Sequence, residues 1–438
     1  MTWIAGATVL LLSLAGAGAF FVMWSPSPQP QSYLDDWVNQ QWEAEGRLGD
    51  AYMHLLRAGE LAQPFEDVWE AKARELGDEL LFSDPGFIIQ YGEAPRDADA
   101  YLAAVEHIEA MRAAGVFDEI RAFRLEGAGL PRPDVLRKQF DAKSGAGFLL
   151  GARRNMDLCL TGARLALAKG DIEGAIELYR DAAELADMGG ADRSAVGHLV
   201  RMSIDAELRE EVQLSATEYE MNSDQLRDLI SLAGRPLGST FERAMDGLSR
   251  ATDVEDVRGD FTTGWGYRRS RKHWNRLLDS VAGVSMVSMW RSPPGFPEPG
   301  VLDKLDATDA PFDVWDFADT LTRIAESSVQ DEIDRRGTVC ALAIELYRVE
   351  RGVLPDSLPV ALESAGLDIS IATDPAWDSN FEYRREASAR RGYSLYAKGD
   401  GVDDGGVFSE FRRFEALSRE PSGLDIDLTR VRAPFPEE

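Results

Sequence analysis

The sequence has little of the chemistry that catalytic and metal-binding motifs require. Its 438 residues include two cysteines, Cys159 and Cys340, and four scattered histidines that form no pair at metal-ligand spacing. It also lacks a Gly-x-Ser-x-Gly motif, a His-Glu-x-x-His motif and a phosphate-binding loop. We therefore predict neither a catalytic residue nor a cofactor. Both cysteines have apolar neighbours, as small buried residues do, and the sequence alone does not decide whether they form a disulfide.

Basic charge is also scarce. The chain carries 76 acidic and 47 basic residues, for a formal net charge of −29. This excess argues against a nucleic-acid partner, because a negatively charged protein repels phosphate. The one concentrated basic run, residues 268–273, has aromatic neighbours. It fits contact with an anionic lipid or polymer, or a solvated helix face beside the acidic body, and we favour the second interpretation.

An apolar run long enough to span a bilayer occurs at residues 3–24, which carry no charge. At a helical rise of 1.5 Å per residue, the run covers about 30 Å, and Trp3 and Trp24 bracket it as interfacial aromatics do. A cleaved signal peptide is the alternative, because residues 17–19 resemble a cleavage site, although the apolar run continues beyond them. We expect residues 1–24 to be a single-pass anchor in the cell membrane, with the bulk of the chain extracytoplasmic, in the periplasm.

The remainder is expected to be mainly α-helical, with a small C-terminal α+β module. Residues 25–32 are rich in proline and predict a stiff, extended linker. Residues 33–237 carry apolar residues at helical intervals and predict an irregular helical bundle. Residues 238–311 predict an irregular or helical connector. Within it, the apolar segment 281–290 is too short to span a bilayer and is expected to be a core helix.

The clearest helical pair lies at residues 149–186. The first helix is expected to end before Gly170, and Asp171 is expected to cap the second. With its small residues at the helix contact, this unit resembles a tetratricopeptide repeat. No second copy follows at the expected period, and we favour the alternative of one hairpin in an irregular bundle.

The C-terminal module is expected to span residues 312–415. A long helix with an apolar stripe is predicted to end at Gly352, where glycine suits the position after a helix end. Two alternating segments, 380–384 and 393–397, predict an antiparallel hairpin. Residues 416–438 are expected to be a C-terminal tail.

This order of elements resembles the C-terminal domain of the major pseudopilin of type II secretion systems. The matching positions, from the turn through the strands to the glycine-rich loop, are Gly352, Pro355, Leu358, Asp374, Pro375, Trp377, Asn380, Tyr383, Gly392, Tyr393, Leu395, Tyr396, Gly399, Asp400 and Gly401. The chain as a whole resembles large exported proteins of planctomycete-type bacteria that carry such a segment.

The resemblance implies that the acidic loop can bind calcium, with the carboxylates of Asp400, Asp403 and Asp404 as ligands. The loop is shorter than the family's, and an acidic turn without an ion is the interpretation we favour. The sequence also departs from the family at its start, where the basic leader and the early glutamate are missing. We therefore do not expect it to polymerise as a pilus subunit.

These observations lead to a hypothesis about function. We expect a membrane-anchored, extracytoplasmic protein of the interaction or scaffold type, linked to secretion or envelope organisation, with a protein partner in the cell envelope. One alternative is a carboxylate-based hydrolase of the envelope, for which abundant acidic residues are a weak signal. A second is a pilin-like structural subunit.

Overall fold

A computed structural model describes eight parts of the chain, separated by gaps. These parts are residues 51–76, 98–127, 147–191, 195–236, 314–387, 389, 391–398 and 426–428, with residue 389 standing alone beside the hairpin turn. The predicted anchor at residues 1–24, the linker at 25–32 and the connector at 238–311 lie outside them. None of the described helices combines the length and apolarity needed to cross a membrane.

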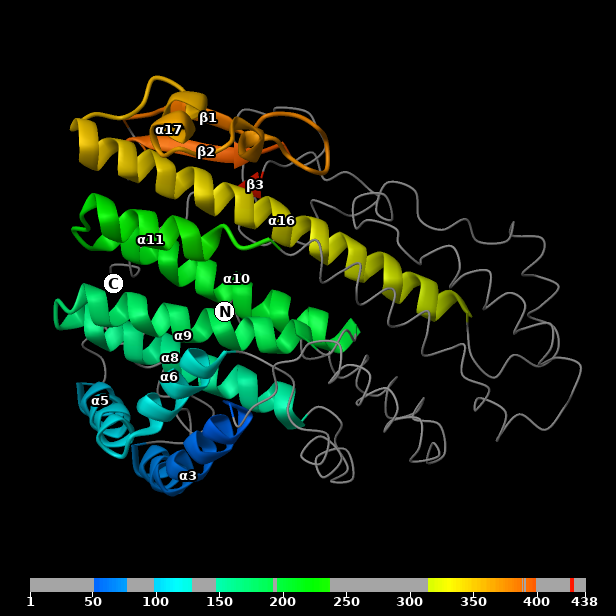
Figure 1. Cartoon of the computed structure of the whole chain (residues 1–438). Coiled ribbons are helices and arrows are strands. Elements are labelled where there is room, and N and C mark those ends of the chain that lie inside the picture. Colours follow the sequence, from blue (N-terminus) through cyan, green and yellow to red (C-terminus); the bar gives the residue numbers. More distant parts are fainter. Residues whose placement is uncertain are drawn as a thin grey trace, which may run out of the picture.

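The described part of the chain is mainly helical, as predicted, and its helices lie in successive layers (Figure 1). At one end α3, α5 and α6 pack together, and α8 with α9 forms the next layer. α10 and α11 follow, then α16, and a small sheet with α17 lies at the other end. The helix bounds are α3 (Ala51–Leu76), α5 (Ala98–Ala113), α6 (Val116–Glu126), α8 (Gly147–Ala168), α9 (Ile172–Ala191), α10 (Ala195–Glu218), α11 (Ser223–Ala233), α16 (Val314–Arg351) and α17 (Leu358–Ser364).

The predicted helical hairpin is present as α8 and α9. Gly170 has a φ of +78°, in the left-handed region that glycine adopts without strain. The carboxylate of Asp171 accepts a hydrogen bond from the backbone N–H of Gly174, at 3.0 Å, and so caps α9. In the next hairpin, α10 and α11, Asn222 caps the start of α11 through a reciprocal pair of hydrogen bonds with Gln225.

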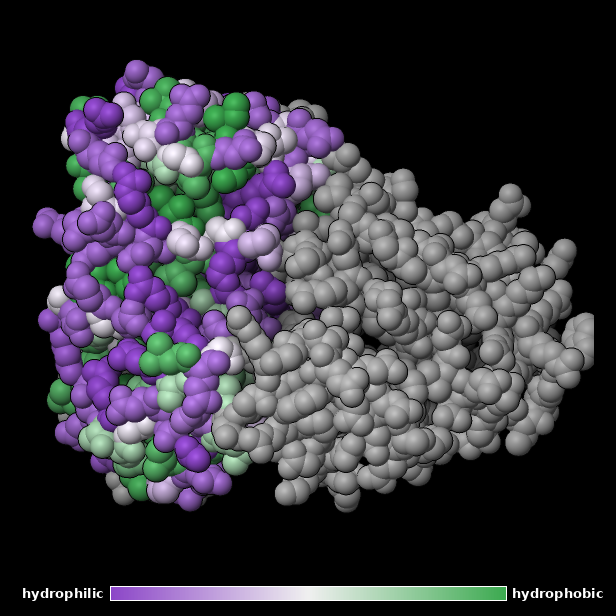
Figure 2. Space-filling view, in the orientation of Figure 1, coloured by the Kyte–Doolittle hydropathy of each residue, from purple (hydrophilic) through white to green (hydrophobic). Residues whose placement is uncertain are grey.

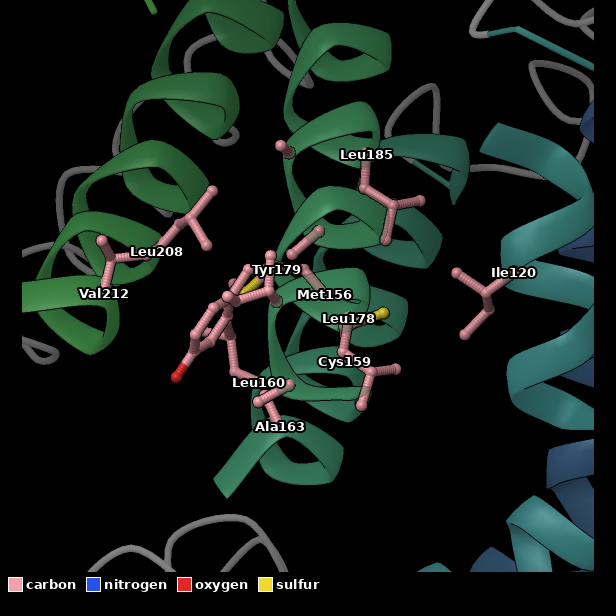
Figure 3. Close-up of a cluster of buried hydrophobic side chains, with 14 of the residues drawn as sticks. Ile120, Met156, Cys159, Leu160, Ala163, Leu178, Tyr179, Leu185, Leu208 and Val212 are labelled. Atoms are coloured by element: carbon pink, nitrogen blue, oxygen red, sulfur yellow. The ribbon is translucent and has the colours of Figure 1, made fainter. Parts of the chain in front are cut away.

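The centre of the larger core lies between these layers (Figure 3). Tyr179 of α9 is fully buried among side chains of α8 and α10, and its hydroxyl lies 2.6 Å from Oγ of Ser215. Met156, Cys159 and Leu160 of α8, Leu178 and Leu185 of α9, Leu208 and Val212 of α10, and Ile120 of α6 belong to the same cluster. One continuous apolar core therefore joins the layers from α3 to α11.

Helix α16 takes part in two cores. Val339, Leu342 and Leu346 belong to the larger core with α10 and α11. Other faces of the helix carry Ile333 and Ile344, which pack into a second core beneath the sheet. The helix ends at Arg351, one residue before Gly352, whose φ is +73°. This end agrees with the sequence prediction.

The sheet has the antiparallel order β1-β2-β3. The predicted hairpin is confirmed as β1 (Glu382–Arg385) and β2 (Tyr393–Ala397), with Glu382 opposite Tyr396. The third strand, β3 (Ile426–Asp427), falls within the segment expected to be a tail. A two-residue strand is too short to show an alternating pattern, so periodicity could not reveal it.

The two cysteines are free and lie in different cores, Cys159 in the larger one and Cys340 beneath the sheet. Burial raises the pKa of both thiols above the usual range. They therefore stay protonated and act as small apolar side chains.

Candidate functional site

The residues predicted to bind calcium, Asp400, Asp403 and Asp404, lie outside the described residues, and calcium binding stays a prediction. Within the described ranges, no cluster of three or more His, Cys, Asp or Glu side chains is arranged to hold a metal ion. Most of the buried polar side chains lie on α10 and on the layers that contact it. We describe this part of the molecule as the candidate site.

A polar stripe runs along α10. Arg201, Asp205, Arg209 and Gln213 follow one another at intervals of four residues, so they share one face of the helix, and all four are buried. Buried charges are stable only when they are paired or hydrogen-bonded. The stripe therefore requires partners on the neighbouring elements.

Arg209 is paired with Asp331 of α16, and both side chains are almost fully buried. Burial raises the pKa of the Asp331 carboxyl to about 7, with Arg209 opposing this effect and the charges of Asp205 and Asp334 adding to it. No residue in the described part of the chain donates a hydrogen bond to the second carboxylate oxygen of Asp331. This oxygen can therefore take up a proton near neutral pH.

Arg201 belongs to a second network, which joins α9 and α10 to the segment after α11. Its guanidinium contacts Asp205 at 3.3 Å and Asp187 of α9 at 3.1 Å, and it donates to the Pro236 carbonyl at 3.3 Å. Arg235 contacts the same Asp187 oxygen at 2.6 Å. Two guanidinium groups thus share one carboxylate, which fixes where the chain leaves α11.

His198 and Ser328 form a buried hydrogen bond, with Nε2 and Oγ 2.9 Å apart. The Ser328 hydroxyl donates to the Ile324 carbonyl at 2.7 Å, so Nε2–H of His198 donates to Oγ. Burial, with a smaller effect from Arg201, lowers the pKa of His198 to about 3 and keeps the imidazole neutral. A histidine with this tautomer cannot take the serine proton, and both side chains are buried. The pair cross-links α10 and α16.

Similar buried pairs occur at the other layer contacts. Nε of Arg124 on α6 donates to Asp181 of α9 at 2.5 Å, and Asp181 is fully buried. Arg164 of α8 and Glu211 of α10 form two parallel hydrogen bonds, at 2.9 and 2.7 Å. Bidentate arginine–carboxylate pairs combine a favourable charge interaction with a fixed geometry. Each of the contacts α6–α9, α8–α10 and α10–α16 therefore contains at least one arginine–carboxylate pair whose carboxylate is buried.

Glu345 connects α16 to the sheet module. Arg391, in the hairpin turn, contacts the two Glu345 oxygens at 3.1 and 2.8 Å, and Tyr393 donates to Oε1 at 3.3 Å. Arg391 also donates to the Thr217 carbonyl of α10 at 2.5 Å. Burial and, to a lesser extent, the Glu345 charge raise the pKa of Tyr393 well above its usual range. The sheet is therefore held to two helical layers by one arginine.

The sequence predicts a helical bundle over residues 33–237, but its pattern did not single out the polar stripe of α10. The four-residue spacing of Arg201, Asp205, Arg209 and Gln213 was visible in the sequence. Charged residues on one helix face normally point to solvent, so the spacing alone did not indicate that these residues are buried. What the spacing could not show is the partner helix. Arg209 and Asp331 are 122 residues apart in the chain.

Comparison with known proteins leaves the chain without a match: no family model, no curated protein and no solved structure is similar to it.

Proposed function

We propose that this protein is a membrane-anchored, extracytoplasmic scaffold that contacts a protein partner of the cell envelope through the end layers of its helical stack. The proposal includes a transmembrane anchor at residues 3–24, a tetratricopeptide-like hairpin at α8 and α9, and a pseudopilin-like C-terminal module. The order of α16, the Gly352 turn, α17 and the β1–β2 hairpin supports the last of these.

The distribution of exposed apolar side chains carries the proposal. Among the described residues, large hydrophobic side chains that are exposed lie only in α3, α5 and α6 at one end of the stack and, at the other end, in the last turns of α16 and in the sheet module. At one end these are Leu61, Val68, Leu102 and Leu125 of α3, α5 and α6, and at the other Val349, Val353, Val360, Ile369 and Trp377. On the face in Figure 2, hydrophobic residues interrupt a mostly hydrophilic surface. Surfaces that bind protein partners commonly include exposed apolar side chains that become buried in the complex.

The middle layers suit a rigid support. Their contacts combine the continuous core around Tyr179 with the buried pairs Arg164–Glu211 and Arg209–Asp331. Charge pairs of this kind fix the register of packed elements, because a shifted arrangement leaves a buried charge unpaired. A stack with a fixed register holds its two end surfaces at a constant separation, as a scaffold requires.

The alternative of a carboxylate-based hydrolase would draw on Asp331, whose pKa of about 7 suits a general acid. Its side chain is 5% exposed and paired with Arg209. This position favours a structural role over contact with a substrate.

The partner surface is tested by photo-crosslinking in cells that express the full chain. A photoreactive residue is placed at Val68 or Leu125 in one end layer, or at Val353 or Trp377 in the other, with exposed Glu220 of the middle layers as the matched control. We expect a discrete protein adduct from at least one end layer and none from Glu220. Equal adducts at all positions, or none at the four apolar ones, would contradict the proposal.

The anchor is tested separately by comparing the full chain with a variant that lacks residues 2–24. We expect the full chain in the membrane pellet after a carbonate wash and the variant in the supernatant. Retention of the variant in the pellet would show that residues 3–24 are not the anchor.

A further inference from the structure

Leu428, immediately after β3, contacts three elements that lie far apart in the chain. Its backbone N–H donates to the Leu395 carbonyl of β2 at 2.9 Å, and its carbonyl accepts from Nε2 of Gln213 on α10 at 2.8 Å. Its side chain packs on Gly337 of α16 and is almost fully buried. We call the edge of β2 at Leu395 together with Gly337 and Gln213 the Leu428 site.

Gly337 makes this close packing possible. A Cβ at this position would lie 2.7 Å from Cδ2 and 2.9 Å from Cδ1 of Leu428, closer than real Cβ atoms approach another carbon. Glycine is a poor helix former, and Gly337 lies inside α16, well away from both of its ends. The close approach of Leu428 gives a reason for glycine at this position.

The backbone of the segment is held by strand pairing. Ile426 and Asp427 lie opposite Ala397 and Tyr396, and the Leu428–Leu395 hydrogen bond extends this antiparallel pairing. The other edge of β2 is occupied by β1. Backbone pairing at a strand edge, with one buried side chain as anchor, is how many domains bind extended peptides.

The side chain of Gln213 acts as a clamp on the segment, and only one of its two polar atoms takes part. Its side chain is about 99% buried, and its amide nitrogen is bonded to Leu428, but its Oε1 has no hydrogen-bond partner among the described residues. A buried acceptor without a partner is costly and is normally satisfied by a ligand, a water molecule or another protein group. It is an acceptor available to a bound peptide beside the backbone of the segment.

We propose that the Leu428 site is a binding site for an extended, leucine-bearing peptide, and that the protein's own residues Ile426–Leu428 occupy it in cis. The contacts that hold the segment are those of a bound ligand: backbone pairing, one apolar anchor and one side-chain clamp. The site therefore accepts a peptide of this kind from solution when the cis segment is weakened. This inference goes beyond the scaffold role and does not depend on the end layers.

The test uses the full chain and a fluorescent synthetic peptide of residues 423–431, with binding followed by fluorescence anisotropy. In the Leu428→Ala chain the cis segment loses its anchor, and we expect it to bind the peptide at least about tenfold more tightly than the unmodified chain does. A peptide carrying Leu428→Ala is the matched ligand control and should bind at least about tenfold more weakly. Adding Gly337→Ala to the Leu428→Ala chain fills the anchor position and should abolish peptide binding.

Three outcomes would overturn the proposal as a whole, and a fourth would overturn its cis arrangement. The first is equal peptide binding by the unmodified and Leu428→Ala chains, and the second is equal binding of the two peptides. The third is loss of helical circular dichroism in the Leu428→Ala chain, because the segment would then be part of the folding core. A dimer by light scattering that Gly337→Ala converts to a monomer would assign the segment to a second copy and overturn occupation in cis.

Discussion

Nδ1 of His54, on α3, lies 2.5 Å from Oε2 of Glu119 on α6. The other ring nitrogen, Nε2, lies 3.0 Å from Oε1 of Glu126, about two turns further along α6. A neutral imidazole has one N–H, so it can donate to only one of two carboxylates. This geometry requires the imidazolium form, and the hydrogen bonds that His54 donates, to Glu119 first and to Glu126 second, raise the pKa of His54.

This arrangement predicts a pH-dependent contact between α3 and α6. The pKa of His54 is higher in the folded than in the unfolded protein. The stabilisation of the fold by the charged His54 is therefore fully present below about pH 6.5 and is lost as the pH rises through the folded-state pKa. We expect the free energy of unfolding in urea to fall by about 0.5–1 kcal/mol across this range, as for a partly exposed ion pair. His54→Gln should remove this fall, whereas Glu60→Gln, at an exposed position of α3, should retain it. An unchanged profile in His54→Gln would contradict the assignment.

A second prediction concerns the proton on Asp331. Its raised pKa means that the folded protein binds a proton there more readily than the unfolded chain, so this group's contribution to stability declines between about pH 4 and pH 7. Arg209 lowers this pKa, so Arg209→Met should move the Asp331 titration above pH 7. Carboxyl infrared difference spectra against pH would measure the midpoint. Arg227→Met, at a surface pair with Glu350, should leave it in place.

A third prediction compares a buried ion pair with an exposed one. The Arg164 and Glu211 side chains are 13% and 3% exposed, whereas those of Arg227 and Glu350 are 46% and 23% exposed. Glu211→Ala leaves a buried guanidinium without its partner, and we expect a loss of about 3–5 kcal/mol in the free energy of unfolding. Glu350→Ala should cost less than about 1 kcal/mol. Similar losses in urea unfolding would show that burial does not distinguish the pairs.

The cap of α9 gives a fourth prediction. Asp171→Ala removes the acceptor for the Gly174 N–H and should lower the free energy of unfolding by about 1 kcal/mol. Asp171→Asn retains an oxygen at the same place and should retain most of the stability. Thermal unfolding of the two variants measures the difference, and equal losses would indicate that the charge of Asp171, and not its hydrogen bond, stabilises the helix.

Local features of this fold could be predicted from the sequence. Gly170 and Asp171 marked the break between α8 and α9, Gly352 marked the end of α16, and alternating residues marked β1 and β2. These signals act over a few residues, where backbone conformation and capping decide the outcome.

The candidate site could not be predicted in the same way. Arg164 and Glu211 are 47 residues apart, and Gln213 and Leu428 are 215 apart. Helical spacing shows that such residues share a face, but not which distant helix covers it. The same limit applies to β3, which pairs with β2 where the next residue, Leu428, contacts α10 and α16.

The position of α16 between two cores has a consequence for any attempt to divide the protein. A fragment that starts at residue 312 keeps Ile333 and Ile344 covered by the sheet but uncovers Val339, Leu342 and Leu346. A fragment that stops before α16 uncovers the facing side chains of α10 and α11. A cut on either side of α16 therefore leaves core side chains exposed on at least one fragment, which makes a poor boundary for separate expression.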